Sequence, residues 1–357
     1  MREKRVEKVL ALLRTADLDG CLLKGMDNIF YLTGFRGSEG TLLVTKGDIY
    51  LMTDFRYITY AQEVTQGIKI VEVFNKKNIL WEICSHHGIR KIGFDSIHTP
   101  FSIYKKWSEA LEGVELVPLD DPIEEIRKNK EPEEIDNIVK AIEVATKAFT
   151  EVFERIRPGQ SEKNVANDLE YAMRRFGAEG PSFPTIVASG PRAALPHAEP
   201  SDKTIQNGEM VIIDFGAQVN GYCSDETCTL SIGEVNGKIQ DVYAVVSNAK
   251  NAALERIKVG VPIKEVDMIV RGYIDEAGYG DFFRHGTGHG VGIAVHEAPS
   301  INSTGDGILE EGMVITVEPG IYLPNIGGVR LEDMVLITAG SPRMLTRIRK
   351  DELHIKV

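Results

Sequence analysis

The chain has 357 residues, which is long enough for two domains and a large hydrophobic core. Hydrophobic residues make up 43% of it and charged residues 26%, the proportions of an ordinary globular protein. The formal net charge of −12 argues against nucleic acid and acidic membranes as partners.

The first twenty residues are basic and then apolar, but charged residues interrupt the apolar stretch. Val6, Leu10 and Leu13 mark one face of an amphipathic helix, so we expect a helix here and not a signal peptide. No apolar run approaches the length of a membrane span. The four cysteines form no C-x-x-C and no secreted disulfide pattern, which predicts a cytoplasmic protein.

Residues up to about 120 alternate between helix-like and strand-like segments. The strands include CLL near Cys21, then TLLVT, IYLMT and the KIGF that precedes Asp95. This order predicts a small α/β domain over residues 1–121. A charged segment over 122–134 is the expected linker, and 135–357 is the expected catalytic domain.

The most informative hairpin lies in the C-terminal part. The β-rich runs VIIDFGAQV and YCSDETCTL are separated by Asn220-Gly221, a strong signal for a two-residue type I′ turn. Closing this turn pairs Asp214 with Thr227, so Asp225 projects from the same face as Asp214. Asp214 follows an apolar run, where a charge is costly unless it is paired or binds a metal. We therefore expect the two carboxylates to share a cation.

A second pair of carboxylates lies near the C-terminus. Glu318 closes the apolar strand MVITVE, and Glu332 is expected inside the strand VRLEDMVLIT, with a wider loop over 324–328 between them. Helical segments precede each apolar strand, which predicts a pseudo-repeat whose halves bring all four carboxylates into one cleft. These helical segments are expected at 135–156 and 164–176 in the first half and at 239–277 in the second.

Histidines lie between the two carboxylate pairs. His285, His289 and His296 fall within twelve residues, in HGTGHGVGIAVHE. The glycines argue against a helix, so His285 and His289 are not an i, i+4 zinc pair. H-E-x-x-H fails because position 300 is Ser300, and no phosphate-loop motif is complete. A glycine-rich strand that lets the backbone approach a site closely is the better explanation.

The donor types indicate the metal. Four carboxylates, one imidazole and no thiolate suit two divalent ions, Mn(II) above all, with Co(II), Fe(II) or Zn(II) as possible occupants. The predicted ligands are Asp214, Asp225, His289, Glu318 and Glu332.

These motifs resemble a known family. The stretches D-F-G…S-D-E-T, H-G-T-G-H-G-V-G…V-H-E, E-P-G-I-Y and V-R-L-E-D are similar to the motifs of the pita-bread metallopeptidases, in the branch of aminopeptidase P and prolidase. The likeness runs from near Pro132 to the end. G-F-R-G-S-E-G-T-L-L-V-T and T-D-F-R-Y resemble the smaller leading domain of aminopeptidase P-like proteins.

The resemblance implies a fold and an assembly. The fold is α/β (α+β), with a small N-terminal domain of the creatinase/prolidase type. A C-terminal pita-bread domain built from pseudo-two-fold halves follows it. The resemblance also implies a homodimer.

The resemblance implies a role for each ligand. Asp214 would chelate one metal, Asp225 and Glu332 would bridge both, and His289 with Glu318 would complete the other.

It also implies a set of catalytic and pocket residues. Glu318 would lie near a metal-bridging hydroxide and carry its proton to the leaving amine. His296 would steady the scissile carbonyl oxygen, and His197 would lie on the substrate side. His285 and Arg330 would be substrate-binding or supporting residues. The simpler alternative is that Arg330 only orients the carboxylates of V-R-L-E-D and that His285 only packs beneath the site.

The resemblance implies cleavage before proline in peptides with proline at the second position. A dipeptidase must anchor the proline carboxylate, and prolidases typically place an arginine between V-H-E and E-P-G. From Gly286 to Val329 the chain has no Lys or Arg. This favours an Xaa-Pro aminopeptidase. The alternative is an Xaa-Pro dipeptidase (prolidase) with Arg192, Arg330 or a neighbouring subunit as the anchor.

Three other classes stay open. Methionine aminopeptidases share the fold and metals but usually lack a large leading domain. A non-catalytic pita-bread binding protein would be expected to have lost metal ligands, and all five are present here. A creatinase-like hydrolase shares the domain layout but need not keep every metal carboxylate.

Overall fold

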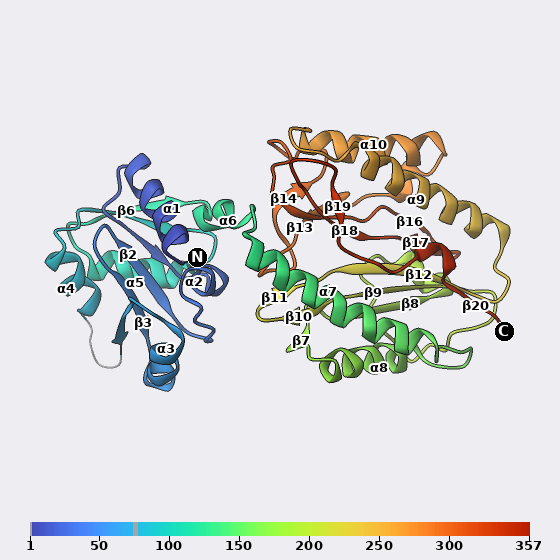
Figure 1. Cartoon of the computed structure of the whole chain (residues 1–357), viewed down its shortest axis with the longest axis horizontal. Coiled ribbons are helices and arrows are strands. Elements are labelled where there is room, and N and C mark those ends of the chain that lie inside the picture. Colours follow the sequence, from blue (N-terminus) through green and yellow to red (C-terminus); the bar gives the residue numbers. More distant parts are fainter. Residues whose placement is uncertain (1, 74–77) are drawn as a thin grey trace. The chain divides into compact units, whose positions relative to one another are not determined.

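The computed structural model describes residues 2–73 and 78–357 and separates into two compact units, Met1–Arg127 and Lys128–Val357 (Figure 1). The division falls inside the segment expected as a linker. That segment is largely helical, because α6 (Pro122–Arg127) and the first turn of α7 (Pro132–Phe153) occupy it. Glu131 caps α7 together with the Glu134 side chain, and Pro132 at the first helical position suits this start.

The N-terminal unit is built on one six-stranded sheet in the order β4-β3-β2-β1-β5-β6. Strands β1, β5 and β6 run parallel, whereas β2 is antiparallel to both β1 and β3. The predicted strands appear as β1, β2, β3 and β5, which confirms the small α/β domain. Its helices and strands are α1 (Arg2–Thr15), β1 (Gly20–Leu23), α2 (Met26–Thr33), β2 (Thr41–Thr45), β3 (Ile49–Thr53), α3 (Ile58–Val64), β4 (Lys69–Glu72), α4 (Ile79–His86), β5 (Lys91–Asp95), α5 (Phe101–Ala110) and β6 (Glu115–Leu119).

The C-terminal unit places sheets between two helix pairs (Figure 1). In its first half α7 packs against β10 and β11, and α8 packs against β7 and β8. The sheets of this half have the orders β11-β10-β7 and β20-β12-β9-β8. The elements are α8 (Glu162–Arg175), β7 (Gly180–Pro181), β8 (Ile186–Ser189), β9 (Met210–Phe215), β10 (Ala217–Val219), β11 (Tyr222–Cys223), β12 (Glu226–Ile232) and the C-terminal β20 (His354–Ile355).

The second half repeats this plan. The helical segment expected over 239–277 is two helices with a break at 257–262, and they pack against β14, β15, β16 and β17. The sheets have the orders β14-β13-β15-β18-β19 and β16-β17. The halves confirm the expected pita-bread fold. The elements are α9 (Gly237–Arg256), α10 (Ile263–Glu276), β13 (Gly288–Gly290), β14 (Glu297–Ile301), β15 (Val314–Val317), β16 (Gly320–Leu323), β17 (Gly327–Arg330), β18 (Asp333–Leu336) and β19 (Arg343–Met344).

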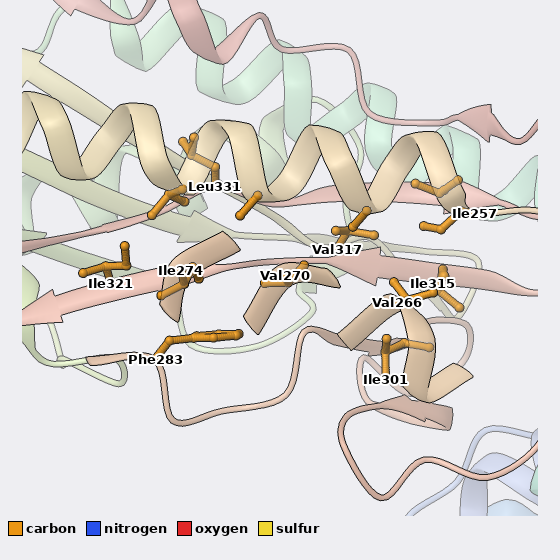
Figure 2. Packing of buried hydrophobic residues seen from close by; sticks show 14 of the residues in the cluster. Ile257, Val266, Val270, Ile274, Phe283, Ile301, Ile315, Val317, Ile321 and Leu331 are labelled. Atoms are coloured by element: carbon orange, nitrogen blue, oxygen red, sulfur yellow. The ribbon is translucent and has the colours of Figure 1, made fainter. Parts of the chain in front are cut away.

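The core of the second half contains apolar side chains from α9, α10 and several strands, β15 among them. Val266, Val270 and Ile274 recur every four residues on α10 and point toward the strand that carries Ile315 and Val317 (Figure 2). All five side chains are fully buried. Burying a side chain of this size contributes about 1.5–3 kcal/mol, so the contact anchors the strand that immediately precedes Glu318.

The predicted N-terminal helix is present as α1, but its buried face differs from the expectation. Val9 and Leu13 are fully buried, whereas Val6 and Leu10 are half-buried. Arg5 is also buried, because its guanidinium lies 4.1 Å from the centroid of the Tyr31 ring and donates to the Tyr31 carbonyl. Among the described residues, no helix is both long and apolar enough to cross a membrane.

Candidate metal centre and active site

The first hairpin has the predicted register. Asn220 and Gly221 both have positive φ, at 51° and 80°, as a type I′ turn requires. Asp214 on β9 pairs with Thr227 on β12. Asp225 lies immediately before β12 and two residues from Thr227, so it shares a face with Asp214.

The second carboxylate pair lies at two strand ends. Val317, the last residue of β15, pairs with Asp333, the first residue of β18. Continuing this register by one residue places Glu318 opposite Glu332. The prediction that Glu332 sits inside a strand was therefore wrong, because it lies between β17 and β18. The expected wide loop is also shorter, with only 324–326 between β16 and β17.

The histidine strand β13 needs its glycines. A Cβ on Gly288 would lie 2.1 Å from the Thr316 carbonyl oxygen, and one on Gly290 would lie 2.1 Å from that of Ala298. Only glycine allows the neighbouring backbones to come so close. His289 stands between these two glycines and projects toward the carboxylates.

The donor atoms of the predicted ligands converge. His289 Nε2 lies 3.6 Å from Asp225 Oδ2 and 3.5 Å from Glu318 Oε1. Glu332 belongs to two of the convergent groups. Three groups have donor atoms within 4.8 Å of one another: Asp214 with Asp225 and Glu332, His289 with Glu318 and Glu332, and Asp225 with His289 and His296.

The carboxylates of this centre repel one another. Burial, followed by the charges of neighbouring carboxylates, raises the pKa of Asp225 and of Glu332 well above the ordinary value. Burial raises the pKa of Glu318 to about 8, although Arg330 acts in the opposite direction. Asp214 Oδ1 is buried and has no hydrogen-bond partner among the described residues. Divalent cations would reduce the repulsion between the carboxylates and would give Asp214 Oδ1 a binding partner. The residues therefore fit two metal ions.

His289 has the protonation state of a metal ligand. Burial, followed by the nearby His296, lowers its pKa to about 4. The ring is therefore neutral at pH 7. Its Nδ1 lies 3.0 Å from the Gly290 carbonyl oxygen and donates to it, which leaves the Nε2 lone pair facing the carboxylates.

Arg330 is buried beside the ligands. Its Nη2 donates to Asp214 Oδ2 at 2.7 Å, and its Nε donates to Thr227 Oγ1 at 3.2 Å. The Thr227 hydroxyl in turn donates to Glu332 Oε2 at 2.8 Å. Arg330 thus orients Asp214 directly and Glu332 through Thr227.

Tyr322 is the main residue that the sequence interpretation missed, although it lies in the quoted E-P-G-I-Y motif. Its hydroxyl accepts from Arg330 Nη1 at 2.8 Å and lies 3.0 Å from His285 Nε2. Burial raises the pKa of Tyr322 to about 12 and lowers that of His285 to about 4, so both groups are neutral. His285 Nδ1 donates to Gly286, which leaves its Nε2 to accept from the tyrosine. His285 is thereby tied to Arg330.

A cavity of about 540 Å³ opens onto these groups. His197 and His296, both exposed, line it together with the predicted metal ligands and His285. Apolar residues also line this cavity, namely Phe183, Pro184, Ile186, Pro196 and Ala198.

The cavity offers few positively charged groups to the free C-terminal carboxylate of a dipeptide. Among its described lining residues Arg330 is the one with a permanent positive charge, and its guanidinium is already bonded to Asp214, Tyr322 and the Pro196 carbonyl. Arg192 does not line the cavity. It donates to Glu162 Oε2 at 2.9 Å and to a backbone carbonyl.

Comparison with known families agrees with this geometry. The profile of metallopeptidase family M24 matches residues 136–339, which contain all five predicted ligands. The chain belongs to metallopeptidase family M24. The profile of the creatinase/prolidase N-terminal domain matches residues 5–128. The resemblance stated from the motifs is thus confirmed, and the chain is a metallopeptidase.

Relatives within the M24 family match nearly the whole chain. The Xaa-Pro dipeptidase of Pyrococcus furiosus is 38% identical over 353 residues, covering 98% of this chain and all of the relative. A solved Xaa-Pro dipeptidase from Bacillus anthracis is 38% identical, with a TM-score of 0.96 over 99% of this chain and 100% of that one. A solved X-Pro aminopeptidase from Thermotoga maritima is 37% identical, with a TM-score of 0.87 over 96% and 98%.

Proposed function

We propose that this M24 metallopeptidase hydrolyses the bond before proline, with the free Xaa-Pro dipeptide as its preferred substrate. The observation that carries the proposal is the convergence of five donor residues in the lining of one cavity, namely Asp214, Asp225, His289, Glu318 and Glu332. Four carboxylates and a neutral imidazole match two divalent cations, and Mn(II) suits this donor set best.

The relatives support the dipeptidase. Both Pyrococcus relatives that match the chain at 38% identity are named Xaa-Pro dipeptidases, and so is the Bacillus anthracis structure. The comparisons thus favour this alternative over the aminopeptidase preferred from the sequence. The aminopeptidase stays the second candidate for one reason. Arg330 is committed to protein partners, and no other described lining residue offers a permanent positive charge to a C-terminal carboxylate.

Divalent cations at such a site supply Lewis-acid polarisation of a carbonyl and a water molecule of lowered pKa. The chain itself supplies proton transfer and orientation. Glu318 has its carboxylate among the cavity-lining groups, so it can accept a proton from a water molecule and return it to the leaving amine. It is half-buried and lines the cavity, so it is accessible to a water molecule and to a leaving amine.

The exposed histidines bind and orient the substrate in this proposal. His296 lies against His289, with ring centroids 4.3 Å apart, which places it beside the metal ligands. From there it donates a hydrogen bond to the scissile carbonyl oxygen as negative charge develops. His197 lies next to the apolar residues Pro196 and Ala198 and contacts the substrate from that side.

The test compares Xaa-Pro dipeptides with Xaa-Pro-Yaa tripeptides, using chelated and Mn(II)-loaded protein side by side. The proposal predicts faster turnover of the dipeptide and none after chelation. Faster turnover of the tripeptide would establish the aminopeptidase instead. Activity that survives chelation would overturn the metal assignment. The homodimer implied by the resemblance stays a prediction, which sedimentation equilibrium tests.

A further inference from the structure

Each of two candidate ligands is followed at once by a second buried acid. Glu226 follows Asp225 at the start of β12, and Asp333 follows Glu332 at the start of β18. Successive side chains of a strand point to opposite faces. The ligand of each pair therefore faces the cavity, and the second acid lies behind it.

The ammonium group of Lys350 forms ion pairs with both Glu226 and Asp333. Lys350 Nζ lies 2.7 Å from Glu226 Oε1 and 2.7 Å from Asp333 Oδ1. The three residues are at most 6% exposed. Burial acts to lower the pKa of Lys350, but the charges of Glu226 and Asp333 outweigh it, so the lysine stays protonated. Hydrogen bonds from a charged ammonium group to carboxylate oxygens are short and directional.

Lys350 crosses the junction between two sheets. Strand β12 belongs to the β20-β12-β9-β8 sheet and β18 to the β14-β13-β15-β18-β19 sheet. Asp225 and Glu332 lie one residue outside the regular ladders of these strands, which begin at Glu226 and Asp333. One backbone hydrogen bond, from Glu332 N to the Thr227 carbonyl, spans the junction at this level. The spacing of the two ligands therefore depends also on what holds the residues next to them.

Two further contacts cross the junction, because Asp225 N donates to Met334 Sδ at 3.2 Å and Thr227 Oγ1 donates to Glu332 Oε2 at 2.8 Å. Other groups around Asp333 hold only the β18 side. Lys250 on α9 forms an ion pair with Asp333 Oδ2, and Thr346 Oγ1 donates to Asp333 Oδ1 at 2.7 Å. In the described part of the chain, Lys350 is the residue hydrogen-bonded to both Glu226 and Asp333. Lys350 is itself fixed through its carbonyl oxygen, which accepts from the Tyr243 hydroxyl.

We propose that Lys350 is a positioning residue of the metal centre, which fixes the spacing between Asp225 and Glu332 across the two sheets and thereby sets the affinity for the pair of divalent cations. This inference rests on the proposed function, because that function assigns the two carboxylates as metal ligands. Lys350 is not among the described residues that line the cavity, so its effect passes through the strands.

The test is a calorimetric titration of the metal-free, full-length protein with Mn(II). We expect Lys350→Met to weaken at least one of two binding steps about 10- to 100-fold, as loss of a group that orients a metal ligand commonly does. Lys250→Met and Thr346→Val, which release only the β18 side, should weaken binding less. Lys203→Met is the matched control, because Lys203 also forms an ion pair, with Glu209, but contacts neither strand start. Its binding should equal that of the wild type.

A second readout separates positioning from a general loss of structure. Raising the Mn(II) concentration should restore the turnover of Lys350→Met, with the KM for the peptide unchanged. Wild-type Mn(II) affinity in folded Lys350→Met would overturn the inference. If that variant does not fold, Glu226→Gln takes its place, because it weakens the contact of Lys350 with the β12 side, and wild-type Mn(II) affinity in that variant would overturn the inference.

Measurements on the wild-type protein test the proposed function separately. A wild type that binds two Mn(II) ions but cleaves no Xaa-Pro peptide would refute the proposed function and leave the inference on Lys350 standing. A wild type that binds no Mn(II) would refute both.

Discussion

Arg330 holds Asp214 through a 2.7 Å hydrogen bond from Nη2 to Oδ2. The two residues are 116 positions apart and come from different halves of the C-terminal unit. The same guanidinium also donates to Tyr322 and to the Pro196 carbonyl, so its hydrogen-bond donors are already used by protein groups. This arrangement orients a metal ligand and leaves little of Arg330 for a substrate carboxylate.

Arg330→Lys should therefore damage the metal centre although it keeps the positive charge. An ammonium group cannot reproduce the directed contacts of the guanidinium. We expect the Mn(II) affinity to fall about tenfold or more, because the orientation of Asp214 is lost. Arg192→Lys is the control, since Arg192 binds Glu162 away from the cavity. Equal losses in the two variants, measured by Mn(II) titration, would contradict the role of Arg330.

Asp225→Asn and Glu332→Gln should each abolish peptidase activity and reduce the bound metal below two ions per chain. An amide removes the negative charge that a divalent cation requires. In metal-free protein the same changes should raise the melting temperature, because the pKa values of both carboxyls are raised by burial and mutual repulsion. Metal analysis measures the bound ions, and thermal unfolding followed by circular dichroism measures the melting temperature. Turnover near that of the wild type in either variant would refute the ligand assignment.

The stability of the metal-free protein should depend on pH through Glu318. Its pKa is about 8 in the folded protein because of burial, against about 4.3 in an unfolded chain. Between these values the unfolded state releases the proton and the folded state keeps it. The free energy of unfolding therefore falls as the pH rises from about 5 to 8. Glu318→Gln should flatten this slope in denaturant titrations at several pH values. An equal slope in wild type and variant would contradict the assignment.

Substitutions of the two exposed histidines should change different kinetic constants. His296→Ala should lower kcat about 100-fold or more, because a hydrogen bond to the developing negative charge acts in the transition state. His197→Ala should mainly raise KM, because its contact is with bound substrate. Steady-state kinetics on an Xaa-Pro dipeptide test both. The metal content should stay at the wild-type level in each variant, and loss of metal from His296→Ala would make that histidine a ligand instead.

Local turn chemistry explains why the first hairpin was predictable. Asn220-Gly221 determines the turn type, the turn determines the register, and the register places Asp214 and Asp225 on one face. The break between α9 and α10 also had a local signal that was overlooked. Gly260, with a φ of 86°, and Pro262 stand between the two helices and interrupt the predicted helical segment.

Contacts between distant segments explain what the sequence did not reveal. Tyr322 matters because it meets Arg330 and His285, and neither periodicity nor a turn signal indicates such a meeting. Lys350 lies 124 residues from Glu226, in a C-terminal segment without a recognised motif. The preference for a dipeptide or a longer peptide also depends on contacts between distant segments. These contacts determine which positively charged side chains in the cavity remain available to a substrate carboxylate.

The most direct test of the account is a titration of metal-free protein with Mn(II) during hydrolysis of an Xaa-Pro dipeptide. The account predicts no turnover without metal and a rise that reaches its plateau at two ions per chain. Full turnover in the chelated protein, or a plateau without bound metal, would contradict the claim that Asp214, Asp225, His289, Glu318 and Glu332 form a two-metal peptidase centre.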